Sequence, residues 1–188
     1  IPKTLALLEE QLIRLQSQIT QKTIIIAAGM IKHLPRSAGD LLERYIGPVQ
    51  ASLAEKKARL LFVTPTEQAQ ASSPYPSEYQ LEHPKLILSN HAGVFCREAL
   101  DIGTRFFLQH LPTDLGSAQV ADLGCGNGVL GIVCALNNPQ AQLRMVDESY
   151  MAVQSAQENW QRALAKRPVI IYAGDGLAAE PPETLDLI

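Results

Sequence analysis

The sequence lacks a long hydrophobic run. Its strongest apolar stretch, TIIIAAGMI at residues 23–31, falls far short of the roughly 18 residues of a membrane-spanning helix. The stretch is rich in β-branched residues and therefore predicts a buried strand, and we expect no membrane partner. Because the chain begins at Ile1 rather than Met, we also expect the natural N-terminus, and any targeting signal on it, to lie outside this sequence.

Cysteine is scarce and is not spaced for pairing. The chain contains Cys96, Cys125 and Cys134, with no CxxC spacing. An odd number of thiols without ligand spacing argues against a disulfide framework and against a zinc site. This pattern is typical of a reducing compartment, so we expect a cytoplasmic protein without a metal.

The two parts of the chain carry opposite charge. Residues 1–63 contain nine Lys and Arg against five Asp and Glu, a net charge of +4, whereas residues 64–188 contain seven against fourteen, a net of −7. Such an asymmetry suggests a polyanionic partner for the first part and a different task for the second.

The first part predicts the order helix, strand, helix, strand. A stripe with spacing of three and four residues indicates a first helix and consists of Leu5, Leu8, Leu12, Leu15 and Ile19. The segments KTIIIAAGM and ARLLFVT predict strands, and Ser37 with Asp40 resembles a capping box for the helix between them. We interpret residues 1–63 as the latter part of an α/β unit. Residues 64–84, rich in Pro, Ser and Gln, predict a linker or an exposed excursion.

From residue 85 the pattern becomes that of a second α/β domain. KLILSNHAGVF is strand-like, and residues 97–111 predict a helix. Three strands then alternate with two helices, which predicts a parallel sheet whose ligand binds beyond the carboxyl ends of the strands. Each of these three strands ends at or next to an aspartate, namely Asp122, Asp147 and Asp175.

A glycine-rich loop follows the first of these strands, in VADLGCGNGVLG at residues 120–131. Gly126, Gly128 and Gly131 match the dinucleotide template GxGxxG. Asp147 lies 21 residues beyond Gly126, about where a ribose-binding acid is found. A nicotinamide-dependent oxidoreductase is therefore one interpretation.

Asp122 favours a different ligand. In a partly dry pocket its carboxylate would repel the phosphates of a dinucleotide, whereas S-adenosylmethionine has no phosphate and carries an ammonium and a sulfonium. We predict that Asp122 binds the ammonium, Asp147 the ribose hydroxyls and Asp175 the adenine amino group. Each aspartate could instead serve as a turn former or helix cap, and Asn127 could merely shape the loop. The predicted cofactor-binding set is Asp122, Gly124, Gly126, Asn127, Asp147 and Asp175.

Longer stretches resemble a known family. ADLGCGNGVLG resembles the first motif of class I S-adenosylmethionine-dependent methyltransferases. NHAGVFCREALDIGTRFFLQHLP, residues 90–112, is similar to a segment of bacterial ribosomal RNA guanine-N2 methyltransferases that carries VFSR and LD.G, with Cys96 where that family usually has Ser. VDES at residues 146–149 matches the family's second motif, and the first helix resembles its first domain.

This resemblance implies an α/β fold with two methyltransferase-like halves. Residues 1–63 would be the C-terminal part of a degenerate, RNA-binding half. Residues 85–188 would be the N-terminal part of the active half, a class I Rossmann-like parallel sheet that binds S-adenosylmethionine. The implied reaction is methyl transfer to the exocyclic N2 of a guanine in large-subunit ribosomal RNA, with the small subunit as the alternative. We expect a monomer. A non-enzymatic binding module that retains the cofactor fold is a further alternative.

The family's catalytic motif, Asn-Pro-Pro-Phe, follows the fourth strand of its sheet. Here that strand is predicted at LDLI, residues 185–188, so we expect the motif beyond Ile188 and assign no catalytic residue. EPPET at residues 180–184 contains Pro-Pro, but it precedes the strand and lacks the Asn. His91, beside a predicted turn, suits a structural role better than that of a general base.

Overall fold

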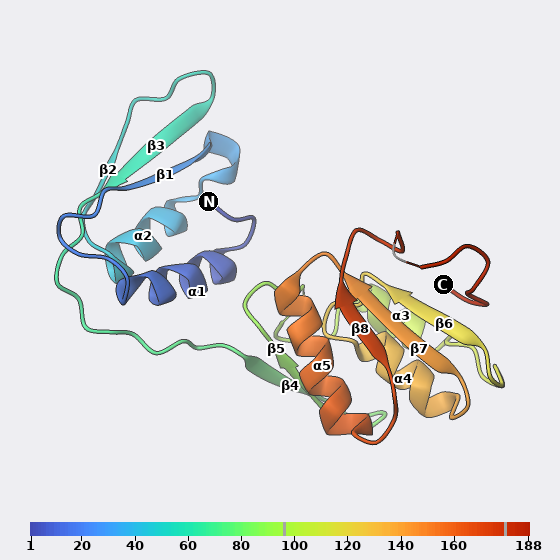
Figure 1. Ribbon diagram of the computed structural model, residues 1–188. Helices are drawn as coiled ribbons and strands as arrows, with labels where there is room; N and C mark the ends of the chain where they lie inside the picture. The colour runs from blue at the N-terminus through green and yellow to red at the C-terminus, as the bar shows by residue number, and fades with distance from the viewer. Residues whose placement is uncertain (96, 179) are drawn as a thin grey trace. The chain divides into compact units, whose positions relative to one another are not determined.

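The computed structural model describes residues 1–95, 97–178 and 180–188 of the chain (Figure 1). It divides into two compact units, residues 1–74 and 75–188. Each unit has its own hydrophobic core. Cys96, at which the sequence departs from the resembled family, lies outside the described residues.

Unit 1 packs two helices against a small antiparallel sheet. Its elements are α1 (Leu5–Gln16), β1 (Ile25–Met30), the 3-10 turn η1 (Ile31–His33), α2 (Arg36–Tyr45), β2 (Val49–Ala51) and β3 (Ala58–Val63). The strand order is β1-β3-β2, and both pairings are antiparallel. The core between sheet and helices contains Leu8, Leu12, Leu42 and Leu61. The predicted helix, strand, helix, strand order is thus confirmed, with the short β2 in addition.

Two local predictions for unit 1 were wrong. In α1 the buried face contains Leu8 and Leu12, whereas Leu5 and Leu15 are each 41% exposed, and the helix ends before Ile19. The helix α2 begins at Arg36, directly after an N-cap proline that makes no side-chain cap hydrogen bond. Ser37 therefore lies inside the helix, and it is not the first residue of a capping box. The fixed φ of proline already suits a helix start.

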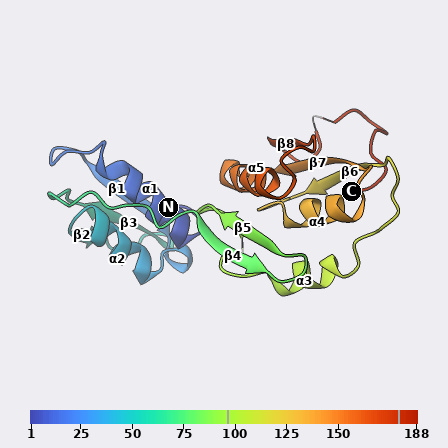
Figure 2. The same cartoon turned by 90° about the horizontal axis from the view of Figure 1, so that it is seen from below.

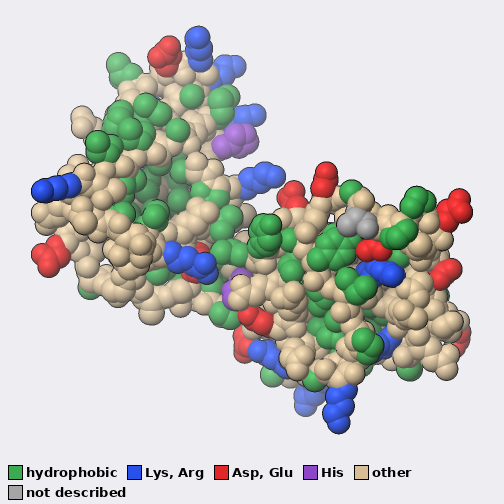
Figure 3. Space-filling view, viewed as in Figure 1, with side chains coloured by type: hydrophobic (Ala, Val, Ile, Leu, Met, Phe, Trp, Pro, Cys, Tyr) green, Lys and Arg blue, Asp and Glu red, His purple; other side chains and the backbone are tan. Residues whose placement is uncertain are grey.

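The turn between β2 and β3 has an unusual composition. Glu55 and Ala58 exchange two backbone hydrogen bonds of 3.0 and 2.8 Å, which close a two-residue loop. The loop residues Lys56 and Lys57 have φ values of +47° and +64°, the left-handed region that such turns require and that Asn and Gly adopt most readily. Both lysines are exposed, and Figure 3 shows Lys and Arg side chains gathered around this tip.

The predicted linker over residues 64–84 contains a strand. Its first part is extended and lies along α1, where Ala71 N donates to Gln16 Oε1 at 2.8 Å and Ser73 Oγ donates to Glu10 Oε2 at 2.5 Å. Residues 77–81 then form β4, so the linker prediction was wrong there. The neighbouring prolines at positions 74 and 76 and the polar composition concealed the alternating pattern of this strand.

Unit 2 contains the expected parallel sheet. Its elements are β4 (Ser77–Leu81), β5 (Leu86–Asn90), α3 (Ile102–Leu108), β6 (Gln119–Leu123), α4 (Val129–Asn137), β7 (Gln142–Asp147), α5 (Tyr150–Leu164) and β8 (Ile170–Ala173). The strands β6, β7 and β8 pair in parallel in that order. The strands β4 and β5 form a separate antiparallel hairpin, which Figure 2 shows apart from that sheet.

The helices α4 and α5 share one core with the parallel sheet. Ile132 and Trp160 from the two helices pack into the same cluster as Leu143 and Met145 of β7. On the far side of β6, Leu187 makes a single parallel bridge to Val120, where the sequence predicted a fourth strand. The strand β6 therefore has β7 on one side and the segment around Leu187 on the other, which is the switch point at which open α/β sheets bind ligands.

The helix predicted over residues 97–111 is shorter than expected. It begins at Ile102, because the Asp101 carboxylate accepts hydrogen bonds from Gly103 N at 2.9 Å and Thr104 N at 3.0 Å. An aspartate in this role marks the start of a helix. Residues 92, 93 and 95 lie in turns after β5.

Candidate functional site

The glycine loop, residues 124–128, joins β6 to α4. Gly124, Gly126 and Gly128 have φ values of +74°, +55° and +80°, all in the left-handed region. A residue with a Cβ adopts this region only at a cost in energy, so three alternate positions favour glycine for the backbone alone. Gly128 is also the N-cap residue of α4. The fourth glycine, Gly131, has a different reason, since an added Cβ would lie 2.5 Å from Met145 Sδ.

A carboxylate on the neighbouring strand holds this loop. Asp147 is the last residue of β7, and its Oδ2 accepts a hydrogen bond of 2.9 Å from Gly126 N. Its Oδ1 accepts a second bond of 2.8 Å from Ser149 N, at the N-cap of α5. The structure therefore brings Asp147 and the glycine loop together.

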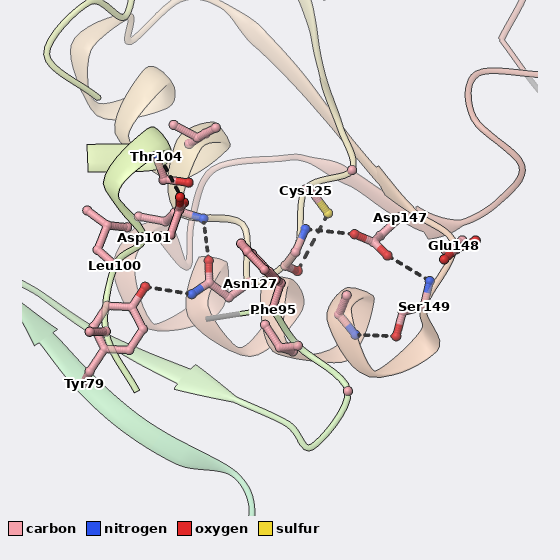
Figure 4. Close-up of a pocket in the computed structure, with 18 residues that line it drawn as sticks. Tyr79, Phe95, Leu100, Asp101, Thr104, Cys125, Asn127, Asp147, Glu148 and Ser149 are labelled. Carbon is pink, nitrogen blue, oxygen red and sulfur yellow. Dashed lines mark hydrogen bonds between the residues drawn. The ribbon is translucent and has the colours of Figure 1, made fainter. Parts of the chain in front are cut away.

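A cavity of about 290 Å³ opens beyond the carboxyl ends of β6 and β7 (Figure 4). Asp147 and Glu148 lie at one end of it, and Tyr79, Leu100 and Asp101 lie toward the other. Three carboxylates line it, and no Lys or Arg is among its described lining residues. Hydrogen bonds from Thr104 and from Gly103 N hold the pKa of Asp101 below its ordinary value, so this carboxyl stays charged.

Four of the six predicted site residues line this cavity. They are Gly124, Gly126, Asn127 and Asp147. Asp122 and Asp175 are not among the lining residues. The structure thus brings together the loop and the acid of the second strand, and it separates them from the other two aspartates.

Asp122 makes a hydrogen bond to the start of a helix. Its Oδ2 accepts a 2.8 Å hydrogen bond from Gly131 N, and its side chain lines a different, largely apolar cavity of about 530 Å³ beside β6. Burial raises the pKa of Asp122 to about 6; the bond from Gly131 N opposes this rise, and the charge of Asp147 adds to it. Asp122 therefore stabilises the first turn of α4, although burial of its carboxylate away from water is unfavourable.

Asp175 lies in a turn after β8, which ends two residues earlier at Ala173. Its side chain is exposed, and its backbone carbonyl accepts a hydrogen bond of 3.3 Å from Ala178 N. This geometry fits the alternative of a turn former, and the contact to an adenine stays a prediction.

Sequence reasoning missed the residues that support the loop from behind. The side chain of Asn127 donates to Asn90 Oδ1 at 2.9 Å and to Tyr79 Oη at 3.1 Å (Figure 4). Its backbone carbonyl accepts from Asn159 Nδ2 at 3.0 Å. A polar residue on the apolar stripe of α5, between Ala156 and Trp160, was the available signal for Asn159. Tyr79 was hidden in the predicted linker.

The thiols and His91 have structural surroundings. Cys125 and Cys134 are free and buried, and burial raises the pKa of both thiols, which keeps them uncharged. His91 Nε2 lies 2.9 Å from Glu158 Oε1, and His91 is not among the cavity's described lining residues. Within residues 1–95, 97–178 and 180–188, no group of three or more His, Cys, Asp or Glu is arranged to hold a metal. Over the same residues, no helix has the length and apolar character to cross a membrane.

Two models of known protein families match this chain. A family model described as the methyltransferase small domain matches residues 85–188, more than half of the chain. The chain belongs to this methyltransferase family. A second model, described as the RLMG N-terminal domain, matches residues 1–67. The resemblance noted in the sequence is thereby confirmed for both parts of the methyltransferase chain.

Relatives and a solved structure agree with this assignment. Proteins named ribosomal RNA large subunit methyltransferase G are similar over all of this chain, at 69% identity in Stutzerimonas stutzeri and 65% in Pseudomonas fluorescens. The chain spans about half the length of these relatives, 50% of each. A Thermus thermophilus 16S rRNA N2 G1207 methyltransferase, RsmC, solved with AdoMet and guanosine, covers 96% of this chain and 50% of its own at a TM-score of 0.74. At 18% identity this likeness shows a shared α/β methyltransferase fold.

The buried carboxyl of Asp122 predicts a pH-dependent stability. A folded-state pKa of about 6, above the ordinary 3.8, means that the folded protein binds this proton more tightly than the unfolded chain. Ionisation of Asp122 therefore lowers the free energy of unfolding. This loss of stability is absent below pH 4, grows between pH 4 and 6, and is complete above pH 6. We expect Asp122→Asn to raise the free energy of unfolding at pH 7 by up to about 3 kcal/mol, since each pKa unit corresponds to about 1.4 kcal/mol. Urea denaturation between pH 4 and 7.5 measures this.

The control is Asp175→Asn, which alters an exposed carboxylate in the same unit. Its effect on stability should not rise over this pH range. A difference between Asp122→Asn and the unaltered protein that stays constant from pH 4 to 7.5 would contradict the prediction.

Proposed function

We propose that this chain forms the cofactor-binding part of an S-adenosylmethionine-dependent methyltransferase that acts on the exocyclic N2 of a guanine in large-subunit ribosomal RNA. The observation that carries the proposal is the cavity between the glycine loop and Asp147, which is lined by three carboxylates and lies beyond the carboxyl ends of β6 and β7 in a methyltransferase-family sheet. The relatives that are 65–69% identical, all named for the large subunit, support the substrate.

The charge of the cavity suits this cofactor. S-adenosylmethionine carries a sulfonium and an ammonium against one carboxylate, so its net charge is positive. Asp101, Asp147 and Glu148 surround it with negative charge, which attracts the cofactor and would repel the pyrophosphate of a dinucleotide. The argument against a nicotinamide cofactor therefore rests on these three carboxylates and not on Asp122.

The chain's own residues would hold the cofactor in the following way. When bound, S-adenosylmethionine supplies an activated methyl group on its sulfonium. The Asp147 carboxylate, already oriented by Gly126 N and Ser149 N, retains lone pairs that can accept from ribose hydroxyls. The glycine loop lets the backbone approach the cofactor closely at Gly124 and Gly126, two lining positions without side chains. Catalysis then requires placement of the guanine amine about 3–3.5 Å from the methyl group.

Unit 1 is proposed to contact the RNA. The excess positive charge of residues 1–63 and the exposed Lys56–Lys57 tip support a surface that binds phosphates. Nearby on β3, Arg59 Nε is shielded from water and has no hydrogen-bond partner among the described residues. In this proposal the protein works as a monomer in the cytoplasm and needs no metal.

Cofactor binding tests the site directly. We expect the protein to bind S-adenosylmethionine and not NAD in isothermal calorimetry. Asp147→Ala should weaken this binding roughly 10- to 100-fold, because hydrogen bonds to a charged group contribute about 1.5–3 kcal/mol. The control Asp175→Ala should leave the affinity unchanged, since Asp175 lies outside the cavity lining. Binding of NAD alone would overturn the cofactor assignment.

Methyl transfer tests the reaction. Labelled S-adenosylmethionine is incubated with unmodified large-subunit or small-subunit ribosomal RNA and with the longest native form of the protein that contains these residues. We expect label in the large-subunit RNA, recovered as N2-methylguanosine after digestion, and a much lower rate with Asp147→Ala. Label confined to small-subunit RNA would contradict the substrate, and label on another atom would contradict the reaction.

Charge reversal tests the role of unit 1. We expect the double variant Lys56→Glu, Lys57→Glu to weaken RNA binding and to lower the slope of log affinity against log salt by about 1.4, or about 0.7 for each phosphate contact on single strands. Affinity for S-adenosylmethionine should be unchanged. The matched control reverses two exposed lysines of unit 2, Lys85 and Lys166, and should have a smaller effect. Equal effects of the two pairs would show a non-specific response to net charge.

A further inference from the structure

Asn159 is a fully buried polar residue on a helix whose buried face is apolar except for Asn159 and Ser155. It belongs to α5, is 0% exposed, and lies between Ala156 and Trp160. Burial of an amide is unfavourable unless hydrogen bonds within the protein replace those to water. Its retention at this position therefore depends on partners, and its partners are all backbone atoms of two other segments.

Two of its hydrogen bonds go to one residue of β5. Asn159 Oδ1 accepts from Ser89 N at 2.7 Å, and Asn159 Nδ2 donates to Ser89 O at 2.9 Å. This is the pairing that a neighbouring strand would offer, and it joins the β4–β5 hairpin to α5. The amide orientation is fixed by this pair, because a flipped amide would place like groups against each other on both sides.

The third hydrogen bond reaches the glycine loop. Asn159 Nδ2 also donates to the backbone carbonyl of Asn127 at 3.0 Å. The Asn127 side chain in turn donates to Asn90 Oδ1 and to Tyr79 Oη, and its Oδ1 accepts from Val129 N at 3.2 Å. Three buried asparagines from β5, the loop and α5 thus form one connected network behind the cavity.

This network acts on the face of the loop opposite Asp147. Asn127 and Gly126 line the cavity, whereas Asn159 and Asn90 are not among its described lining residues. From the cavity side, the Asp147 carboxylate binds Gly126 N; from behind, the Asn159 amide binds the carbonyl of the next residue, Asn127. A loop with three left-handed glycines has little conformational preference of its own. Backbone hydrogen bonds to Val146 O hold Gly124 and Cys125, and the contacts of Asp147 and Asn159 fix the next two residues.

We propose that Asn159 is a positioning residue for the cofactor, and that it acts by holding the Asn127 carbonyl and thereby the loop that lines the cavity. The proposal rests on the assignment of S-adenosylmethionine as the ligand. It also ties Tyr79 to the site, although β4 lies between the segments matched by the two family models, residues 1–67 and 85–188.

The chain offers a matched control in Asn138. Asn138 is 3% exposed and makes three hydrogen bonds of the same kind, with Leu115 N and with the carbonyls of Pro112 and Cys134. It lies at the other end of α4, and none of its bonds reaches the loop. Asn138→Ala and Asn159→Ala therefore remove the same side chain from similar burial, and only the second releases the loop.

Two measurements on these variants, in the longest native form of the protein that contains the chain, test the proposal. The first is amide hydrogen exchange of residues 124–128 without any ligand. We expect it to accelerate at least about tenfold in Asn159→Ala, equivalent to about 1.4 kcal/mol, and to stay unchanged in Asn138→Ala. The second is the affinity for S-adenosylmethionine, which should fall at least about tenfold in Asn159→Ala only. Both variants should lower Tm.

Asn159→Ala removes both a hydrogen-bond donor and side-chain volume, and the variant Asn159→Asp distinguishes these two effects. It has the shape of asparagine but places an oxygen where the amide donated to the Asn127 carbonyl, so we expect it to weaken cofactor binding as Asn159→Ala does. If Asn159→Ala does not fold, Asn90→Ala replaces it, because Asn90 bonds the loop through the Asn127 side chain.

The outcomes separate this inference from the proposed function. Failure of the unaltered protein to bind S-adenosylmethionine would refute the ligand, while loop exchange would still report on the positioning role. Unchanged loop exchange in Asn159→Ala would overturn that role, and so would unchanged affinity in a protein that binds the cofactor. Equal losses in Asn159→Ala and Asn138→Ala would likewise overturn it and leave Asn159 as general support for the fold.

Discussion

The hydrogen bond from Gly126 N to the Asp147 carboxylate joins the two strands on which the site is built. The loop after β6 takes three positive φ values, and backbone hydrogen bonds from Gly124 N and Cys125 N to Val146 O hold its first residues against β7. A charged acceptor at the end of that strand holds the next residue, Gly126, and the same carboxylate fixes the start of α5 through Ser149 N. Because parallel strands end at one edge of the sheet, the acid and the loop meet without a long connection.

Negative charge is the second constraint, and it is distributed in an uneven way. The carboxylates of the cavity remain beside water or are satisfied by backbone N–H groups, as for Asp101 at the start of α3. Asp122 is more deeply placed, and burial raises its pKa. The site thus combines two kinds of acid, those that present charge to the cavity and one that a helix start requires. Mutational data on the site must treat them separately.

The sequence predicted the periodic parts well and the long-range polar contacts poorly. Alternating strands and helices from β6 to β8, and the meeting of Asp147 with the glycine loop, follow from local patterns and from the geometry of parallel sheets. The predictions for Asp122 and Asp175 rest on their places at or near strand ends and on the charge and hydrogen-bonding groups of S-adenosylmethionine. The Asp122 side chain is directed to the start of α4, and Asp175 lies two residues beyond the end of β8, so neither is among the residues that line the cavity. Neither the direction of a side chain nor the last residue of a strand can be read from residue spacing.

Elements without an apolar period were the least predictable. The strand β4 is short, polar and flanked by prolines, so its composition resembles that of a linker. Its place depends on pairing with β5 and on the contact of Tyr79 with Asn127, partners that lie 5 or more residues away in sequence. The helix α3 was predicted too long for a related reason. Its start is set by one capping side chain, and apolar spacing alone does not detect it.

The turn at Lys56 and Lys57 has a consequence for how this protein can change. Both positions favour asparagine or glycine on conformational grounds, and the fold gains nothing from long cationic side chains that extend into water. Selection for thermal stability alone would therefore favour asparagine or glycine at both positions. If charge at this tip contributes to function, the variants recovered under that selection would be more stable but less active. Stability and activity would then have to be screened together.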